Sequence, residues 1–232
     1  MNTNICSAIA QHTAQGWSRP SVLVGSGNDN RSSHNGLLTI FYSSLERAAN
    51  YGWLNAGRTL IDKTYINILW QAASLPPIGV EPTKIASNLD AFIRSELEPI
   101  WQEIEHLSHD EKHRLSIRLI QQAAAEVFGS GYQEQCASWL LFYLCPQLPI
   151  FPISDKLVQA VAGRLQLSEP TADYADYHEQ CRQLYSRMLP NIHTTTPAAC
   201  YGSEQDRNNI DHILRGSDWW QRHCFISQLL AR

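Results

Sequence analysis

Apolar residues recur at intervals of three and four along most of this chain, whereas the alternation of apolar and polar residues that is typical of strands is nearly absent. Spacing of this kind gives a segment one apolar face, as a helix packed on a core requires. The only short strand candidate is Val22 to Val24. The pattern therefore predicts an all-α protein, with helices over residues 37–51, 57–73, 83–107, 109–128, 133–145, 155–167, 171–189, 204–214 and 218–230.

The sequence indicates where one of the expected helices begins. Ser108 and Glu111 stand three residues apart in a capping-box pattern, in which each side chain bonds the backbone amide of the other residue. We therefore expect a helix to begin directly after Ser108. The apolar side chains that follow occupy much of one helical face: Leu115, Leu119, Ala123 and Phe128.

Length and composition indicate a globular chain that can bury a full core. It has 232 residues, of which 44% are hydrophobic and 17% are charged. No internal repeat or long biased linker divides it, so we treat residues 1–232 as a single unit. No run approaches the roughly 18 apolar residues of a membrane helix, and no basic segment followed by an apolar run opens the chain. We expect a cytoplasmic protein that has no membrane partner.

Cysteine and histidine spacing does not indicate a metal site or a cofactor. The six cysteines include no C-x-x-C pair, which argues against zinc and iron–sulfur patterns and favours free, mostly buried thiols. His109 and His113 stand four residues apart on an expected helix, a spacing that can hold zinc. Because the order is not H-E-x-x-H and no third ligand is evident, we expect no metal.

The net charge of −4 is unevenly distributed. Eight acidic residues lie between Glu81 and Glu111, against only Lys84 and Arg94, and the rest of the chain is slightly basic. Arginine supplies most of the basic side chains, and its forked guanidinium suits phosphate and base edges. The charge therefore does not exclude a nucleic-acid partner, although the acidic stretch leaves open a helical interaction protein such as a toxin partner.

Residues 129–162 carry the chemistry that is most distinctive in this chain. Gly129 and Gly131 can turn the backbone so that amide hydrogens point outward at a helix start, where phosphate is commonly held. An apolar helix follows. Pro152 and Ser154 then end that helix and place Asp155 in the first turn of the next one. A simpler interpretation is that Asp155, with Ser154, only caps its helix.

This arrangement resembles the helix-hairpin-helix DNA glycosylases, whose hairpin is followed by an apolar helix and by Pro-x-x-Asp. The segment from Phe151 to Asp155 is especially similar to the adenine-removing branch, and the compact length without an iron–sulfur motif resembles the bacterial oxoguanine-glycosylase-like branch. Relative to the family pattern, this chain has two additional residues between Gly131 and Ala137 and about two more between Ala137 and Asp155. The other matching residues are Gly129, Leu140, Leu141, Leu144, Val158, Val161, Arg164 and Leu165.

The resemblance implies an all-α fold with two helical lobes around a cleft, in which residues 129–167 form the hairpin and the catalytic segment. It implies that Asp155 is the catalytic carboxylate beside C1′ of a flipped nucleotide. Bifunctional members carry a nucleophilic lysine two residues before the matching alanine. Here that residue is Gln135, so the implied enzyme is monofunctional and leaves an abasic site without cutting the backbone.

The resemblance leaves the substrate open. The oxoguanine-glycosylase-like branch includes phage-defence enzymes that remove glucosylated hydroxymethylcytosine, and repair of oxidised purines is the alternative. A non-catalytic DNA-binding helical module is a further alternative. We expect a monomer that binds double-stranded DNA carrying a modified or damaged base.

Further residues are candidates for the base pocket and for DNA contacts. Gln135 is placed to read the base edge, and Trp219 or Trp220 to stack on the base, although both tryptophans can instead pack the last helix onto the core. Trp53 can likewise line the same cleft or pack in the core. The polar loop 28–35 can act as a wedge or be a solvated turn. The candidate DNA contacts are Gly129, Gly131, Lys156, Arg164, Arg31 and Arg58.

Overall fold

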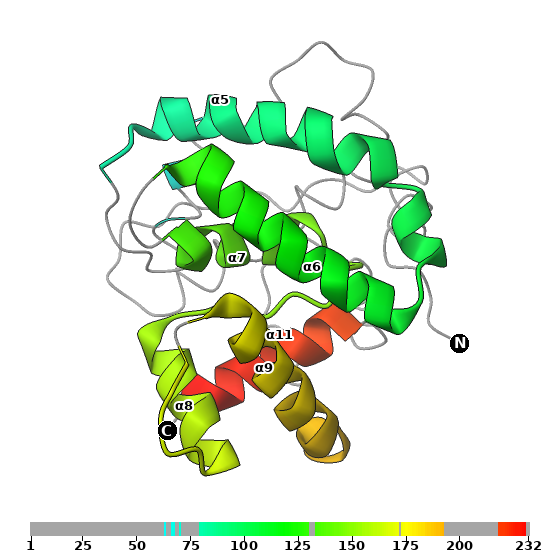
Figure 1. Cartoon of the computed structure of the whole chain (residues 1–232), viewed down its shortest axis with the longest axis vertical. Coiled ribbons are helices and arrows are strands. Elements are labelled where there is room, and N and C mark those ends of the chain that lie inside the picture. Colours follow the sequence, from blue (N-terminus) through cyan, green and yellow to red (C-terminus); the bar gives the residue numbers. More distant parts are fainter. Residues whose placement is uncertain are drawn as a thin grey trace, which may run out of the picture.

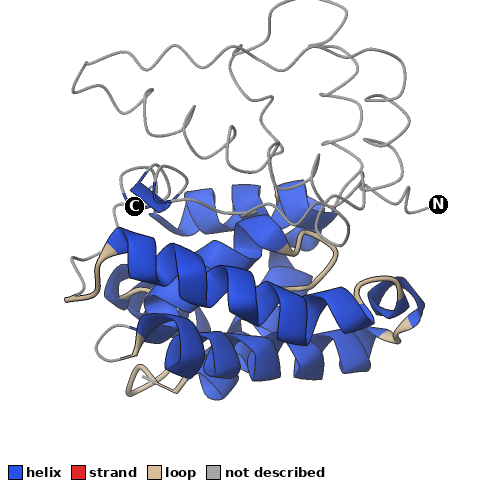
Figure 2. Ribbon diagram, turned by 90° about the horizontal axis from the view of Figure 1, so that it is seen from above, coloured by secondary structure: helices blue, strands red, loops and turns tan. Residues whose placement is uncertain are grey.

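The computed structural model describes residues 63, 66, 67, 70, 79–129, 133–171, 173–192 and 218–230. Within these residues every regular element is a helix and none is a strand (Figure 2), so the predicted all-α class is confirmed for this part of the chain. Four residues of the predicted helix 57–73 are described, and all four are helical. The predictions for residues 22–24, 37–51 and 204–214 lie outside the described residues.

The segment predicted as one helix over 83–107 is divided into shorter elements. Pro99 has no backbone N–H, so it cannot donate the α-helical hydrogen bond expected at its position. The α-helix ends before it, and the chain turns back at this point (Figure 1). The elements are the α-helix α5 (Pro82–Phe92), the π-helical turn η1 (Ile93–Leu97), and the 3-10 helices η2 (Glu98–Ile100) and η3 (Glu103–His106).

α6 (His109–Ala123) begins where the capping box predicts. The Ser108 N–H donates to Glu111 Oε2 at 2.8 Å, and the Glu111 N–H donates to Ser108 Oγ at 3.4 Å. A π-helical turn, η4 (Ala124–Phe128), continues the helix to the end of its predicted span. The apolar face is largely buried, because Leu119, Ala123 and Phe128 are buried and Leu115 is half-buried.

The remaining helices start close to their predicted positions. α9 begins later than predicted because the Asp173 side chain caps it, accepting hydrogen bonds from the Ala175 and Asp176 amides. A 3-10 turn, η5 (Leu189–Asn191), ends this helix. The α-helices are α7 (Gln133–Leu144), α8 (Asp155–Leu165), α9 (Tyr174–Met188) and α11 (Asp218–Leu230).

The described helices form two groups (Figure 1). In one group α6 packs on α7, and α5 packs on η4; in the other, α8 packs on both α9 and α11. A contact between α6 and α9 joins the groups. The four cysteines in the described residues are free and buried, as the sequence predicts: Cys136, Cys145, Cys181 and Cys224.

Residues 145–154 connect the two groups, and we call them the α7–α8 linker. The linker has no helix or strand, yet all of its side chains are buried or half-buried. A buried backbone without secondary structure must find other hydrogen-bond partners for its polar groups. In this linker the partners of several carbonyl oxygens are side chains of α9 and α11, and they fix where α8 begins.

Candidate functional site

Asp155 is the first residue of α8, and the preceding residue caps the helix. The Ser154 hydroxyl accepts a hydrogen bond from the Leu157 amide at 3.4 Å. The Asp155 side chain is exposed and makes no hydrogen bond or ion pair with the described residues. The capping role that is the simpler interpretation of Asp155 therefore belongs to Ser154, and the Asp155 carboxylate stays available.

A buried serine attaches the start of α8 to α7. The Ser138 hydroxyl accepts a hydrogen bond from the Ile153 amide at 3.0 Å and donates to the Gln135 carbonyl oxygen at 2.9 Å. Ile153 lies two residues before Asp155, and Gln135 is the residue that the sequence predicts to read the base edge. Ser138 thus fixes the backbone at both expected site residues relative to one another.

Three side chains of α9 hold the linker from the other side. The Tyr174 hydroxyl donates to the Phe151 carbonyl at 3.1 Å, and the Tyr177 hydroxyl donates to the Pro152 carbonyl at 2.8 Å. A ring nitrogen of His178 lies 2.8 Å from the Pro149 carbonyl oxygen. Burial raises the pKa of both tyrosines well above the ordinary value, so both hydroxyls keep their protons and remain donors.

α11 binds the first part of the same linker. The buried Arg222 guanidinium donates to the Pro146 and Leu148 carbonyl oxygens at 3.0 and 2.9 Å. Burial lowers the pKa of Arg222, and Asp218 and Tyr185 act against that shift. A cation that is removed from water in this way is stabilised by carbonyl dipoles. The linker therefore has a fixed path from α7 to Asp155.

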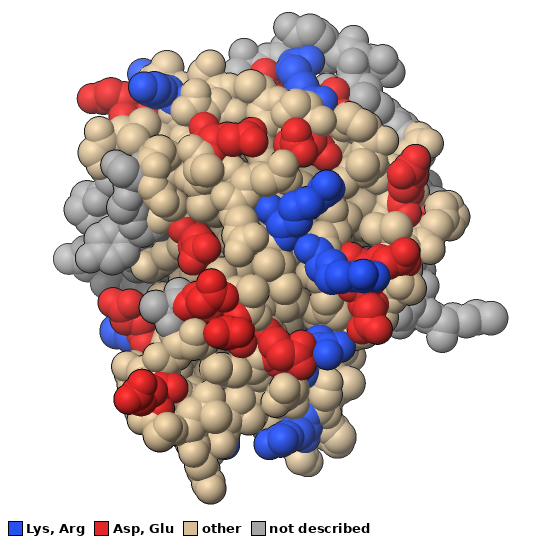
Figure 3. Space-filling view, in the orientation of Figure 1, with Lys and Arg blue, Asp and Glu red and all other residues tan. Residues whose placement is uncertain are grey.

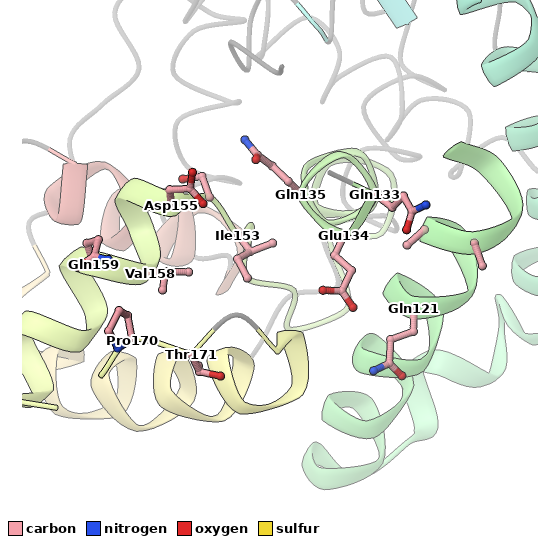
Figure 4. A pocket seen from close by; sticks show the side chains of 13 residues that line it. Gln121, Gln133, Glu134, Gln135, Ile153, Asp155, Val158, Gln159, Pro170 and Thr171 are labelled. Carbon is pink, nitrogen blue, oxygen red and sulfur yellow. The ribbon is translucent and has the colours of Figure 1, made fainter. Parts of the chain in front are cut away.

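A cavity of about 560 Å³ lies between the two groups of helices, within the size range of small-molecule sites. Asp155 lines it from α8 and Gln135 lines it from α7 (Figure 4). The structure thus brings together the two residues that the sequence predicts for the catalytic carboxylate and for base recognition. The other lining residues are Gln121, Ala124, Ala125, Gln133, Glu134, Ile153, Ser154, Val158, Gln159, Pro170 and Thr171.

The charged groups in the described lining of the cavity are all acidic. Its described lining contains two carboxyl groups, those of Glu134 and Asp155, and no lysine, arginine or histidine. Burial raises the pKa of Glu134, and the nearby Asp173 carboxylate raises it further. Glutamine amides supply much of the remaining polar surface. The cavity is therefore suited to a ligand that carries or develops positive charge and offers donors and acceptors along an edge.

Gly129 has a backbone conformation that favours glycine. Its φ is 78° and its ψ is −80°, so it lies in the positive-φ region that favours glycine. The Gln133 side-chain amide donates to the Gly129 carbonyl oxygen, which links Gly129 to the first residue of α7. Gly131 lies outside the described residues, so the hairpin stays a prediction.

The two C-terminal tryptophans are core residues. Trp219 and Trp220 are each 1% exposed, and the Trp219 indole donates to the Phe142 carbonyl at 2.8 Å. The Trp220 ring stacks on the His223 ring with 4.8 Å between centroids. Neither ring lines the cavity, and a base cannot stack on a covered ring. The structure therefore favours core packing, the alternative interpretation, for both residues.

The expected DNA contacts are only partly described. Lys156 and Arg164 are exposed on α8 and make no ion pair with the described residues. Figure 3 shows acidic and basic side chains interspersed on the face that it presents, without a continuous basic patch among its described residues. Trp53, Arg31, Arg58 and the loop 28–35 lie outside the described residues.

The histidine pair on α6 is not arranged around an ion. His109 and His113 lie with their Nε2 atoms 2.9 Å apart and hydrogen-bonded to each other. No group of three or more histidine, cysteine, aspartate or glutamate side chains in the described ranges has an arrangement able to hold a metal ion. Within those ranges, too, no helix has the length and apolar character needed to cross a membrane.

Comparison with known proteins adds no relative. No family model, no curated protein and no solved structure matches this chain. The interpretation of the site therefore depends on its own residues and geometry.

Several residues that build the site were not predicted from the sequence. Ser138 and Arg222 are polar residues on otherwise apolar helix faces, and that isolation is the signal that they have buried partners. The sequence gives no comparable signal that Tyr174 and Tyr177 bond the linker, because a tyrosine on the apolar face of a helix is commonly just a core residue. Glu134 stands next to Gln135 in the sequence, but nothing in the pattern indicates that its side chain faces a cavity.

Proposed function

We propose that this protein is a monofunctional DNA glycosylase, which hydrolyses the N-glycosidic bond of a flipped, modified or damaged nucleotide. The observation that carries the proposal is the cavity in which the exposed Asp155 carboxylate stands opposite Gln135. Two groups of helices with a cavity between them are also what the resemblance to helix-hairpin-helix glycosylases implies.

The charge of the cavity supports this chemistry. Breaking the bond between C1′ and the base builds positive charge on the sugar, and a fixed carboxylate stabilises that charge and orients the attacking water. Among the described lining residues there is no cation to neutralise Asp155. It is also held at the end of a linker with a fixed path, so little reorganisation is needed when the charge develops.

Gln135 supports the monofunctional form of the proposal. A lysine at this position would attack C1′ through its amine and form a Schiff base, which leads to strand cleavage. The glutamine amide cannot do so, but it can donate to and accept from a base edge. Water is then the nucleophile, and the product is an abasic site on an intact strand.

The first test uses purified protein and several DNA substrates. These are duplexes with 8-oxoguanine, duplexes with adenine opposite 8-oxoguanine, and phage DNA that contains glucosylated hydroxymethylcytosine. We expect strand breaks at one of these bases only after alkali treatment, because the enzyme leaves the backbone intact. DNA binding without alkali-sensitive sites on any substrate would instead indicate a non-catalytic binding module.

The second test addresses the nucleophile. Borohydride reduces a Schiff base and traps the protein on DNA, so the wild-type protein should not be trapped. A Gln135→Lys variant is the matched positive control, because it supplies an amine at the same position. Trapping of the wild-type protein, or strand breaks without alkali, would contradict the monofunctional assignment.

A further inference from the structure

Glu134 is the second carboxyl group of the cavity, and the glycosylase proposal gives it no role. It lies in the first turn of α7, and its side chain is half-buried. It makes no hydrogen bond or ion pair with the described residues. Figure 4 shows Glu134 and Asp155 projecting from α7 and α8, with the Ile153 side chain between them. A ligand that fills this cavity therefore meets one carboxyl group from each helix.

The two carboxyl groups have different surroundings. Asp155 is exposed at the start of α8. Glu134 is half-buried, and the charged and titratable groups that face it from α9 are Asp173 and Tyr174. The cavity wall that α6 and η4 supply is uncharged, with Gln121, Ala124 and Ala125. Burial and then the Asp173 carboxylate raise the pKa of Glu134, and no cation in the described residues acts against this shift, so its surroundings favour the protonated form.

We propose that Glu134 is the general acid that protonates the departing base, an inference that rests on the proposed glycosylase function. A pair of carboxyl groups in one site, one of which donates a proton to the leaving group, is the usual arrangement for glycosidic cleavage. A base leaves as a neutral molecule only if it gains a proton, and Glu134 is the one carboxylic acid besides Asp155 among the described lining residues.

The step is balanced with water as the only co-reactant. As the C1′–N bond breaks, its electron pair moves to the base, and Glu134 transfers its proton to a nitrogen or oxygen of that base. Water forms the new bond to C1′ and passes a proton to Asp155. The products are the free base and an abasic sugar, and proton exchange with solvent restores both carboxyl groups.

The test compares two glutamate substitutions on the substrate that the wild-type protein cleaves. Glu134→Gln keeps the size and hydrogen bonding of the side chain but cannot donate the proton, so we expect the excision rate to fall by about 10²–10⁴-fold. Glu126→Gln is the matched control, since Glu126 is exposed on η4 and does not line the cavity. Equal rates for the two variants would overturn the inference while leaving the glycosylase proposal intact.

A pH profile separates a proton donor from a structural residue. We expect the wild-type rate to fall as pH rises through the pKa of Glu134, and Glu134→Gln to lose that dependence. Asp173→Asn keeps a helix-capping side chain but removes the carboxylate that raises the pKa of Glu134, so it should move the fall to lower pH. An unchanged profile in Asp173→Asn would contradict the inference. If the wild-type protein excises no base, both proposals fail.

Discussion

The hydroxyl group of Ser138 connects the two halves of the candidate site. It lies on a helix whose neighbouring side chains are mostly buried and apolar, and it bonds both the Ile153 amide and the Gln135 carbonyl. A single residue thus holds the backbone that leads to Asp155 against the helix that carries Gln135. Loss of this hydroxyl leaves a buried amide without a partner, and such a loss is more costly than the loss of a solvated hydrogen bond.

We expect Ser138→Ala to lower the free energy of unfolding by about 1–3 kcal/mol, because the Ile153 amide stays buried without an acceptor. Urea unfolding measures this loss. Ser116→Ala is the matched control: Ser116 is also a buried helical serine, but its hydroxyl donates only to the Lys112 carbonyl of its own helix. A loss in Ser138→Ala no greater than that in Ser116→Ala would contradict this role.

Individual site residues were predictable to different degrees. The position of Asp155 in the first turn of α8 was predictable, because Pro152 and Ser154 mark the end of one element and the start of the next. Glu134 was not, because whether a helical residue faces a cavity depends on the helices that pack around it. Trp219 and Trp220 show the same limit, since their sequence is compatible both with a stacking platform and with core packing.

At the scale of elements, the α7–α8 linker is the part of the fold that positions Asp155. Its carbonyl oxygens are bonded by Tyr174, Tyr177 and His178 from α9 and by Arg222 from α11. These donors replace the hydrogen bonds that a helix or strand would supply. The linker is thus fixed by two helices that follow it in the sequence, and the site forms only when they pack.

We expect Tyr177→Phe to destabilise the protein by about 1 kcal/mol, because the Pro152 carbonyl loses its donor. We also expect a lower excision rate, since Pro152 lies three residues before Asp155. Tyr185→Phe is the control, because the Tyr185 hydroxyl bonds the Gln221 side chain and does not touch the linker. Excision rates that fall equally in the two variants would show that the linker contact has no special effect on the site.

Local signals predicted most helices but not every boundary. The capping box at Ser108 and the start of α8 after Ser154 follow directly from residue types, and both appear in the structure. The break at Pro99 was missed because apolar spacing continues through it. α9 starts later than predicted because Asp173 is its N-cap, and other polar residues nearby are also of types that can cap a helix. The path of the linker depends on long-range hydrogen bonds, which no local pattern reveals.

At the scale of the whole molecule, the two groups of helices meet at more than one place, and the contact between α6 and α9 is one of them. His113 of α6 and His178 of α9 are buried at this contact, with ring centroids 5.0 Å apart. Burial lowers the pKa of His113 to about 3 and that of His178 to about 4. The charged or titratable groups that also influence these rings are His109, Glu179, Arg182 and Arg222.

These lowered pKa values make stability depend on pH. The unfolded chain takes up protons on both histidines below about pH 6.5, whereas the folded protein does not until about pH 4. The contribution of these two histidines to the free energy of unfolding is therefore greatest above pH 6.5 and falls as pH decreases towards 4. For His178 the slope approaches about 1.4 kcal/mol per pH unit within this range.

Urea unfolding at pH 7 and pH 5 measures this dependence. We expect His178→Gln to reduce it, because the amide can still donate to the Pro149 carbonyl but does not titrate. His106→Gln is the control, since His106 is exposed at the end of η3. A pH dependence in His178→Gln equal to that of the wild-type protein would contradict the assignment of His178.

The most direct measurement of the central claim is the single-turnover excision rate of Asp155→Asn beside that of Asp176→Asn. Both residues are exposed aspartates in the first turn of a helix, but only Asp155 lines the cavity. We predict a fall of at least about 10²-fold for Asp155→Asn and an unchanged rate for Asp176→Asn. An Asp155→Asn rate within about tenfold of the wild-type rate would contradict the claim that this carboxylate stabilises the charge on the sugar.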